Sequence, residues 1–552
     1  MHSDLYIAQH ASLKPIAEVA EQLGLGPDDI DLYGSPYVAK VRLDVLDRLK
    51  DRPNGKYIDI SAITPTPLGE GKSTTLVGLG EAMKHLGKKS VVSLRQPSQG
   101  PTFGIKGGAA GGGHTQVVPM EDLNLHFTGD LHAITAANNL LSALIDAHLL
   151  HGNELRIDPL TISWRRCMDM NDRSLRDIVT SLGGRVNGYP RQTGFDITAA
   201  SEIMALVAVA RDLGDLRARL GRITIGQTFE GEPVTAEQLK AAGSMAVVLK
   251  DAIKPNLVQT LEGQPAFIHC GPFANIAHGN NSLVADRVGL KLGEYLITES
   301  GFASDMGMEK FFDITCRIGG LRSNATVLVA TVRALKHHGG NLNGGMAEIE
   351  GGAANLARHI GIIKHFGLNA VVAVNKFPAD TADELELVKR LALEHGAYAA
   401  EVNAGFEQGG KGVTALAEAV VAAADEPTEF RFAYSYDAPI EEKIRAIATG
   451  VYGADDVFLL KTAKDKAAAF EAAGLGHLPI CMAKTHLSLS HDASLLNAPT
   501  GFTVTVRDLR PYTGAGWIVA LCGDMQTMPG LGKTPAAFSI DVDEQGNIVG
   551  LF

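Results

Sequence analysis

Short apolar runs rich in β-branched residues alternate with helical patterns along most of the chain. Five runs each have the length of one buried strand: Tyr57–Ile63, Ser90–Leu94, Ala266–Cys270, Ala325–Thr331 and Ala370–Asn375. Between them lie amphipathic helical patterns such as Leu76–Leu86. This alternation is typical of an α/β protein with an open, mostly parallel sheet, and such sheets bind ligands at the carboxyl ends of their strands.

One segment interrupts the strand-and-helix rhythm. Residues 151–240 contain the amphipathic pattern Ala199–Leu213 and little that resembles the surrounding repeats. We interpret them as an α+β domain inserted into the sheet. The core would then comprise residues 1–150 and 241–460.

The end of the chain predicts another α+β domain, over residues 461–552. It opens with the Ala- and Lys-rich helical pattern Ala463–Ala473 and continues with the strand patterns Thr503–Leu509 and Trp517–Leu521. Its segment Gly530–Thr534 imitates the end of a phosphate-binding motif. Because proline follows where a helix would begin, we interpret this segment as an ordinary loop.

Composition narrows the range of partners. The chain has 552 residues, 45% of them hydrophobic, and a formal net charge of −12, which argues against nucleic acid or an anionic membrane as a partner. Its five widely spaced cysteines indicate reduced thiols rather than disulfides or a zinc site. We find neither a signal peptide nor an apolar stretch of membrane-spanning length, so we expect a cytoplasmic protein with small-molecule ligands.

The segment Ile63–Thr75 has the organisation of a phosphate-binding loop between a strand and a helix. Gly69 and Gly71 would let backbone N–H groups turn inward, Lys72 would supply a positive charge, and Ser73 would offer a hydroxyl to Mg²⁺. The usual motif has glycine where this chain has Thr66 between two prolines. The alternative is a strand-to-helix turn with an exposed lysine.

A second glycine-rich segment, Gly107–Gly113, follows soon after Arg95. Dense glycine indicates a backbone that a ligand approaches closely, or else a flexible surface loop. Arg95 comes directly after a predicted strand. Its guanidinium could therefore form paired hydrogen bonds to a carboxylate or phosphate at the sheet edge, rather than an ordinary salt bridge.

Several histidines and one aspartate are candidates for proton handling. His126, Asp130 and His132 crowd the start of the helical pattern Ala133–Leu150, and His269 follows a predicted strand. The first group could also lie near Mg²⁺. Helix capping by Asp130 and His132 is the structural alternative.

Two aromatic residues lie next to segments that could bind a ligand. The run ending in Asn375-Lys376 resembles a base-reading loop, but Pro378 stands where the guanine-reading aspartate would be. Phe377 could instead stack on a base or a pterin, and Phe406 offers a second ring. Either ring could equally be part of the core.

These motifs together resemble the formate–tetrahydrofolate ligase family. The resemblance rests on Thr64-Pro-Thr-Pro-Leu-Gly-Glu-Gly-Lys-Ser-Thr74 and on residues 95–113, 127–133, 269–279, 375–378 and 528–537, which occur in the family's order along essentially the whole chain. No length remains for the fused domains of trifunctional members. The resemblance implies a monofunctional enzyme with a P-loop NTPase-like core, which uses ATP to join formate to tetrahydrofolate through formyl phosphate.

The resemblance also implies roles for individual residues. Arg95 would hold formyl phosphate, and His126, Asp130, His132 and His269 become candidates to orient it or to remove the amine proton. Phe377, Pro378 and Phe406 would form an aromatic wall, although family members carry tryptophan at the position of Phe406 and proline at that of Gly532. The ATP phosphates would lie on Pro65, Thr66, Pro67, Leu68, Gly69, Glu70, Gly71, Lys72, Ser73 and Thr74, with Mg²⁺ at Ser73 and Lys72 stabilising the transferring phosphoryl group.

The resemblance further implies a homotetramer that responds to a monovalent cation such as K⁺ or NH₄⁺. Two other interpretations of the motifs remain open. One is another P-loop ATP-dependent ligase that couples a carboxylate to an amine through an acyl phosphate. The other is a nucleotide-dependent switch or assembly protein, which would need neither Arg95 nor Phe377.

Overall fold

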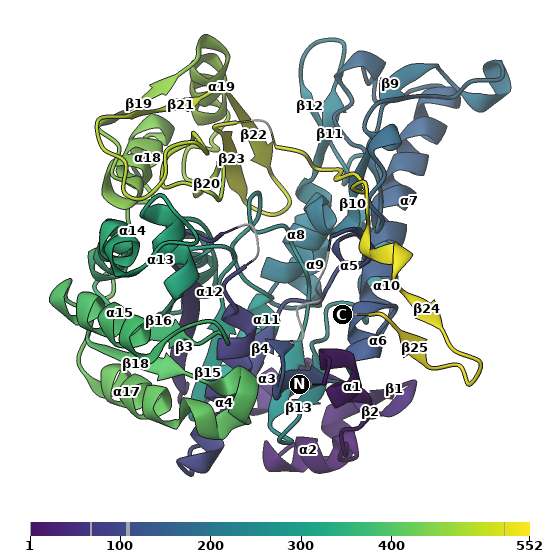
Figure 1. The fold of residues 1–552 in the computed structure, drawn as a ribbon. Coiled ribbons are helices and arrows are strands. Elements are labelled where there is room, and N and C mark those ends of the chain that lie inside the picture. Colours follow the sequence, from purple (N-terminus) through teal and green to yellow (C-terminus); the bar gives the residue numbers. More distant parts are fainter. Residues whose placement is uncertain (1, 67–68, 106–110, 524, 552) are drawn as a thin grey trace.

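A 12-stranded sheet runs through the centre of the computed structural model, which describes residues 2–66, 69–105, 111–523 and 525–551 (Figure 1). The two strands β5 (Gly111–Gly112) and β6 (Thr115–Val118) pair with each other, and β6 also pairs with β13. The other ten strands, in spatial order, are β1 (Ile30–Tyr33), β2 (Ser35–Val41), β13 (Asn256–Thr260), β14 (Pro265–Ile268), β4 (Ser90–Leu94), β15 (Tyr295–Glu299), β3 (Lys56–Ala62), β16 (Ala325–Ala330), β17 (Ala370–Asn375) and β18 (Ala399–Asn403).

The strands from β14 to β18 are parallel to one another, whereas β1, β2 and β13 form an antiparallel edge. The predicted mostly parallel α/β sheet is therefore confirmed, as are its five predicted strands. Sequence patterns missed the other strands of the sheet, which are β1, β2, β5, β6, β13, β15 and β18. Of these, β15 is central to the site, because it lies between β3 and β4.

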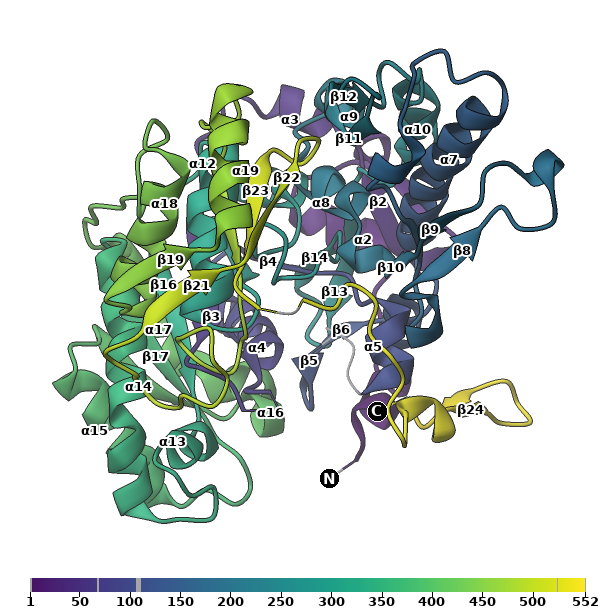
Figure 2. The same ribbon diagram turned by 90° about the horizontal axis from the view of Figure 1, so that it is seen from above.

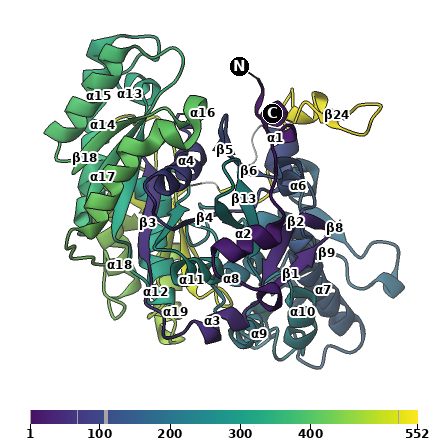
Figure 3. The ribbon, with the colours of Figure 1, turned by 90° about the horizontal axis from the view of Figure 1, so that it is seen from below.

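Helices cover both faces of the parallel strands (Figure 3). In β16, Val327 and Val329 belong to one hydrophobic cluster, while Leu328 and Ala330 belong to the other. Burial on both faces explains why the run is apolar throughout instead of alternating. The α-helices before residue 440 are α1 (Asp4–Gln9), α2 (Ile16–Gln22), α3 (Asp44–Arg48), α4 (Lys72–His85), α5 (Gln99–Gly104), α6 (Met120–Asn124), α7 (Asp130–Leu150), α8 (Glu202–Val209), α9 (Leu213–Arg222), α10 (Ala242–Leu249), α11 (Leu283–Leu292), α12 (Arg317–Gly319), α13 (Val332–His338), α14 (Met346–His365), α15 (Ala382–Glu394), α16 (Gly405–Gln408) and α17 (Thr414–Asp425).

Residues 151–240 contain short strand pairs and two helices. The predicted helical pattern Ala199–Leu213 is divided, because α8 ends at Val209 and α9 begins at Leu213, after the N-cap Asp212. Residues 203–209 are all buried, so α8 is not amphipathic. The strands here are β7 (Arg166–Met168), β8 (Ile178–Thr180), β9 (Arg191–Thr193), β10 (Phe195–Ile197), β11 (Thr224–Gln227) and β12 (Pro233–Thr235), and the β8–β9 hairpin projects from the molecule (Figure 2).

The C-terminal region from residue 440 contains both helices and strands. Its elements are α18 (Ile440–Ala446), β19 (Asp456–Leu459), α19 (Lys461–Ala472), β20 (Ile480–Ala483), β21 (Thr503–Val506), β22 (Asp508–Tyr512), β23 (Trp517–Leu521), β24 (Asp541–Val542) and β25 (Ile548–Val549). β19 pairs with β21 across the predicted boundary at residue 461. The segment Gly530–Thr534 contains no helix or strand, as expected.

Two further expectations concern cysteines and membrane spans. All five cysteines are buried and unpaired, which agrees with structural thiols. Among the described residues, α7 is the one helix that is long and apolar enough to cross a membrane by length and composition alone. It packs against α10 and β7, as a core helix does.

Candidate active site

The glycine loop connects β3 to α4 at the carboxyl edge of the sheet. Gly69 and Gly71 have φ angles of +77° and +78°, in the left-handed region that glycine adopts most readily. Gly71 directly precedes the first helical residue, Lys72, so the N-terminus of α4 points toward the loop. The predicted residues Pro67 and Leu68 lie outside the described part of the chain.

Thr66 has a structural role at the position where a glycine is usual. Its backbone N–H and its hydroxyl both donate to Glu70 Oε1, each across 2.7 Å. The other Glu70 oxygen accepts a 2.5 Å hydrogen bond from the Thr331 hydroxyl and lies 3.7 Å from the Arg333 guanidinium. A buried carboxylate therefore closes the loop and ties it to the end of β16.

Three charged groups meet where β3, β15 and β4 end. Ser73 Oγ donates to Glu299 Oε2 across 2.7 Å, and the other Glu299 oxygen lies 3.9 Å from Arg95 Nη2. Burial lowers the pKa of Lys72, an effect that Glu299 opposes and Arg95 reinforces. Burial also raises the pKa of Asp59, on β3, well above its usual value. Lys72 and Arg95 are therefore both placed beside the buried carboxylate of Glu299.

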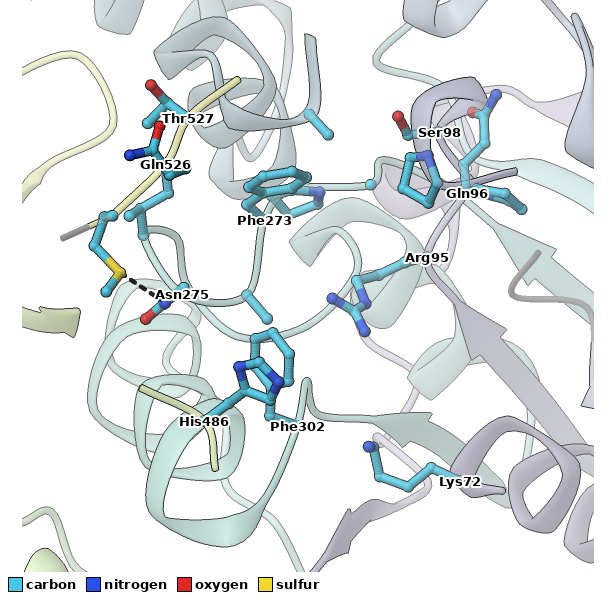
Figure 4. A pocket seen from close by; sticks show the side chains of 18 of the residues that line it. Lys72, Arg95, Gln96, Ser98, Phe273, Asn275, Phe302, His486, Gln526 and Thr527 are labelled. Atoms are coloured by element: carbon cyan, nitrogen blue, oxygen red, sulfur yellow. Dashed lines mark hydrogen bonds between the residues drawn. The ribbon is translucent and has the colours of Figure 1, made fainter. Parts of the chain in front are cut away.

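A cavity of about 680 Å³ opens beside these charges (Figure 4). Arg95 and Lys72 project toward it, and the rings of Phe302 and His486 stack at its wall with their centroids 4.5 Å apart. Gln96 also lines it. Within the described chain, neither polar atom of the Gln96 side chain has a hydrogen-bond partner, and Arg95 Nε has none. The other lining residues are Pro97, Ser98, Pro101, Ala199, Gly271, Pro272, Phe273, Ala274, Asn275, Ile276, Thr485, Met525, Gln526 and Thr527.

Asn375, which ends β17, fastens the start of α4. Its Nδ2 donates to the carbonyl of Glu70 across 2.8 Å, and its Oδ1 accepts from Thr75 and from Asn403 Nδ2. The Asn375 side chain thus fixes the backbone of the glycine loop just before α4 begins. This contact explains why asparagine rather than an apolar residue ends the strand.

The predicted aromatic wall is only partly gathered around the loop. The Arg333 guanidinium lies over the ring of Phe377, 4.8 Å from the ring centroid. Arg333 also donates a hydrogen bond to the carbonyl of Gly69. Pro378 is exposed. Phe406 lies against the described end of the glycine cluster, where its carbonyl accepts from His114 N across 3.0 Å. None of the three lines the 680 Å³ cavity.

The four predicted proton-handling residues do not line the cavity either. His126 and His132 are exposed. His269 is enclosed by Ser282 Oγ and the carbonyl of Ala252, at 2.6 and 2.7 Å, and burial lowers its pKa to about 4. Their role in catalysis stays a prediction.

Asp130 does not cap α7, contrary to the structural alternative. The N-cap is Gly129, and no side chain bonds there. The carboxylate instead accepts from Lys40 Nζ across 2.7 Å and from Asn256 Nδ2 across 2.8 Å. This buried ion pair fixes α7 to the antiparallel edge of the sheet.

Sequence patterns missed Glu299, Phe302 and His486. A polar residue at the end of an apolar strand was the available signal for Glu299, in the run Tyr295–Glu299. Phe302 has a φ of +60°, a conformation that is uncommon for a bulky residue and that the sequence does not indicate. His486 comes from the C-terminal region, so only the folded chain brings it to the cavity.

A parallel sheet with anion-binding charges and an adjoining cavity at its carboxyl edge defines an α/β enzyme. Comparison with known proteins gives the particular family. The sequence model for formate–tetrahydrofolate ligase matches residues 2–552. The chain belongs to the formate–tetrahydrofolate ligase family, whose members are ATP-dependent ligases.

The relatives are similar over their whole length. The formate–tetrahydrofolate ligases of Desulforamulus reducens and Saccharopolyspora erythraea are each 56% identical to this chain and cover 100% of it, with 99% of each relative aligned. That of Cutibacterium acnes is 54% identical, with 100% of both chains aligned.

Proposed function

We propose that this chain uses ATP to join formate to tetrahydrofolate and so forms 10-formyltetrahydrofolate, ADP and phosphate. The observation that carries the proposal is one cavity that Lys72 and Arg95 line together with the stacked rings of Phe302 and His486. A formate oxygen attacks the γ-phosphorus of ATP, ADP leaves, and formyl phosphate results. The secondary amine then attacks the formyl carbon, phosphate leaves, and the amine loses its proton.

The glycine loop is the proposed site of the ATP phosphates, in the manner of a P-loop. Backbone N–H groups from Gly69 to Gly71 and the N-terminus of α4 favour anions, and Lys72 stabilises the charge that develops on the moving phosphoryl group. The residues also suit Mg²⁺, since Ser73 Oγ and the Glu299 carboxylate are oxygen donors 2.7 Å apart. When bound, Mg²⁺ would neutralise phosphate charge.

Arg95 and Gln96 are the proposed holders of formyl phosphate. A one-carbon acid offers almost no apolar surface, so a charged fork and an amide without other partners are suitable means of binding it. Both side chains line the cavity next to Lys72. They would place the acyl group between the phosphate loop and the cavity.

The cavity is the proposed site of the tetrahydrofolate ring system. Its volume of about 680 Å³ is within the range of pockets for drug-sized ligands. The stacked rings of Phe302 and His486, together with Phe273, offer flat faces to a pterin. Phe377 and Phe406 would then serve the nucleotide side, although neither lines the cavity.

The remaining proposals concern the setting of the reaction. We propose a cytoplasmic homotetramer that acts on small molecules only and responds to K⁺ or NH₄⁺. The residue that takes the amine proton is proposed to be among His126, Asp130, His132 and His269. None of them lines the cavity in this structure, so this assignment depends on the family resemblance alone.

The decisive experiment follows 10-formyltetrahydrofolate and ADP with each substrate omitted in turn. We expect both products only when ATP, formate and tetrahydrofolate are all present. Formation of ADP with another acid and amine would favour a different carboxylate–amine ligase, and slow ATP hydrolysis without either substrate would favour a nucleotide-dependent switch.

Replacing Arg95 tests the formyl phosphate assignment. Arg95→Ala should abolish formyl transfer and leave ADP binding largely intact. Arg390→Ala, which removes an exposed arginine from α15, is the matched control and should behave like wild type. Normal turnover by Arg95→Ala would refute the assignment.

A further inference from the structure

Thr64, at the entrance to the phosphate loop, is held by side chains at all three of its polar groups. Its N–H donates to His359 Nε2 across 2.9 Å, and its carbonyl accepts from His338 Nε2 across 2.9 Å. Its hydroxyl lies 2.9 Å from His359 Nε2 and accepts from Asn355 Nδ2 across 3.0 Å. All four residues are buried, the most exposed being His338 at 4%.

The hydrogen bonds require the two histidines to be neutral and of opposite tautomers. His359 Nε2 accepts from Thr64 N–H, so its proton is on Nδ1, which lies 2.7 Å from Ser304 Oγ. His338 Nε2 donates to the Thr64 carbonyl, so its Nδ1 is free to accept from Asn497 N across 3.1 Å. If His359 Nε2 carried a proton, it could no longer accept the hydrogen bond from the Thr64 N–H, and two donor groups would face each other.

Electrostatics supports the neutral state. Burial lowers the pKa of His359 to about 3 and that of His338 to about 4. Both rings are therefore uncharged at neutral pH, and neither can act as a general acid there. Their role is to hold the Thr64 peptide.

The same contacts connect the loop to the C-terminal region. Asn497, whose N–H binds His338, also offers its carbonyl to Asn355 Nδ2 at 2.7 Å. Earlier in that segment, Lys484 Nζ donates to Asp305 Oδ2 across 2.7 Å. Between these two anchors lies His486, which stacks on Phe302 at the cavity wall.

We propose that His338 and His359 are positioning residues, which fix the Thr64 peptide and thereby join the phosphate loop to the segment of residues 484–497, in which Thr485 and His486 line the cavity. The inference depends on the proposed function, in that the loop binds the ATP phosphates. Two parts of the site that would hold different substrates then share one rigid support.

The first test separates positioning from general destabilisation. His359→Leu removes the nearer acceptor of the Thr64 N–H and leaves only Asn355 Oδ1, at 3.3 Å, whereas His359→Gln keeps an acceptor and a donor in the same side chain. We expect His359→Leu to raise the Kd for MgADP and the KM for ATP by about tenfold, and His359→Gln to restore much of the loss. His365→Leu, at the end of the same helix, is the matched control and should keep wild-type Kd and KM whatever its effect on Tm.

The second test examines the connection. In wild type, MgADP should slow amide hydrogen exchange both in residues 63–75 and in residues 484–497. In His338→Leu, MgADP should still slow exchange in residues 63–75, because His359 and Asn355 continue to hold Thr64. Protection of residues 484–497 should be weaker than in wild type, because the Asn497 N–H has lost its acceptor. Thr64→Val, a milder change, should weaken MgADP binding about threefold and keeps the inference testable if the leucine variants do not fold.

The outcomes distinguish this inference from the proposed function. If wild type binds no MgADP, the proposed function fails. If wild type and folded His359→Leu bind MgADP equally well, or if His359→Gln is as impaired as His359→Leu, the positioning role is refuted. If MgADP protects residues 63–75 alone in wild type, the connection to the cavity wall is refuted.

Discussion

Ser73 Oγ donates a 2.7 Å hydrogen bond to Glu299 Oε2, although the two residues are separated by 226 positions in the chain. The contact exists because β15 pairs directly with β3, so the end of one strand faces the helix that follows the other. A hydroxyl and a carboxylate in contact beside the proposed phosphate-binding loop are oxygen ligands of the kind that Mg²⁺ prefers. This pair gives the first prediction.

Glu299→Gln should weaken the use of the metal more than the binding of the nucleotide. The amide keeps the size of the side chain but removes its charge, so we expect the Mg²⁺ concentration for half-maximal activity to rise about tenfold or more. Binding of Mn²⁺ in the presence of ADP, followed by electron paramagnetic resonance, provides a readout besides activity. Glu294→Gln, just before the same strand, should change neither, and equal Mn²⁺ binding by Glu299→Gln and wild type would contradict the assignment.

Phe302→Leu should impair binding of tetrahydrofolate selectively. The change removes a ring that stacks on His486 but keeps an apolar side chain, and we expect the KM for tetrahydrofolate to rise about tenfold while the KM for ATP stays within about twofold. Steady-state kinetics with each substrate varied measures this difference. Phe229→Leu, at an exposed ring far from the cavity lining, is the control. A parallel rise in both KM values would mean that the cavity does not hold the pterin.

Thr66→Val should destabilise the loop. Valine has nearly the shape of threonine but has no hydroxyl, so Glu70 Oε1 keeps the hydrogen bond from the backbone N–H and loses the one from the side chain. We expect this loss to cost about 1–2 kcal/mol of unfolding free energy and to raise the KM for ATP. Thr66→Ser keeps the hydroxyl and should remain close to wild type in both measurements. Urea unfolding and ATP kinetics on the two variants check the expectation, which an unchanged Thr66→Val would disprove.

Glu81 on α4 should make the protein less stable as the pH rises from about 4.5 to about 8. Burial raises its pKa to about 8 from an ordinary value of 4.5, so the folded protein keeps a proton that the unfolded chain has lost over that interval. The part of the unfolding free energy that depends on the ionisation of Glu81 is therefore largest below about pH 4.5. It falls by on the order of 4 kcal/mol as the pH rises to about 8.

Glu81→Gln should remove this decline, because the amide does not titrate. Urea unfolding between pH 5 and pH 9 should give a flatter profile for Glu81→Gln than for wild type. Glu426→Gln, at an exposed position, should retain the wild-type slope. Identical profiles for Glu81→Gln and wild type would show that the folded carboxyl ionises normally.

Patterns in the sequence were sufficient for groups that directly follow an apolar run. Arg95 comes directly after β4, and Lys72 opens the helix after the glycine loop that follows β3. Both line the cavity at the sheet edge that the sequence pattern indicated. The direction of a side chain at such an end was not predictable. His269 also follows a strand, yet it is enclosed between Ser282 and Ala252 instead of facing the cavity.

Groups that depend on strand order were missed. Glu299 belongs to the site only because β15 lies between β3 and β4, and no local pattern specifies that order. The hydrogen bonds that hold Thr64 likewise come from residues of α13 and α14, which both follow β16 in the chain. Local propensity and spacing therefore identify candidate residues, whereas non-local pairing decides which of them meet.

The order of the strands also determines where the two cations lie relative to Glu299. Lys72 and Arg95 follow β3 and β4, which flank β15, so hydrogen-bonded strands about 4.8 Å apart set the spacing of the two cations. That spacing does not depend on the length of chain that connects the strands. Residues 151–240 contribute no described strand to the central sheet, so a change in their length would alter the cavity wall at Ala199 and leave both cations beside Glu299.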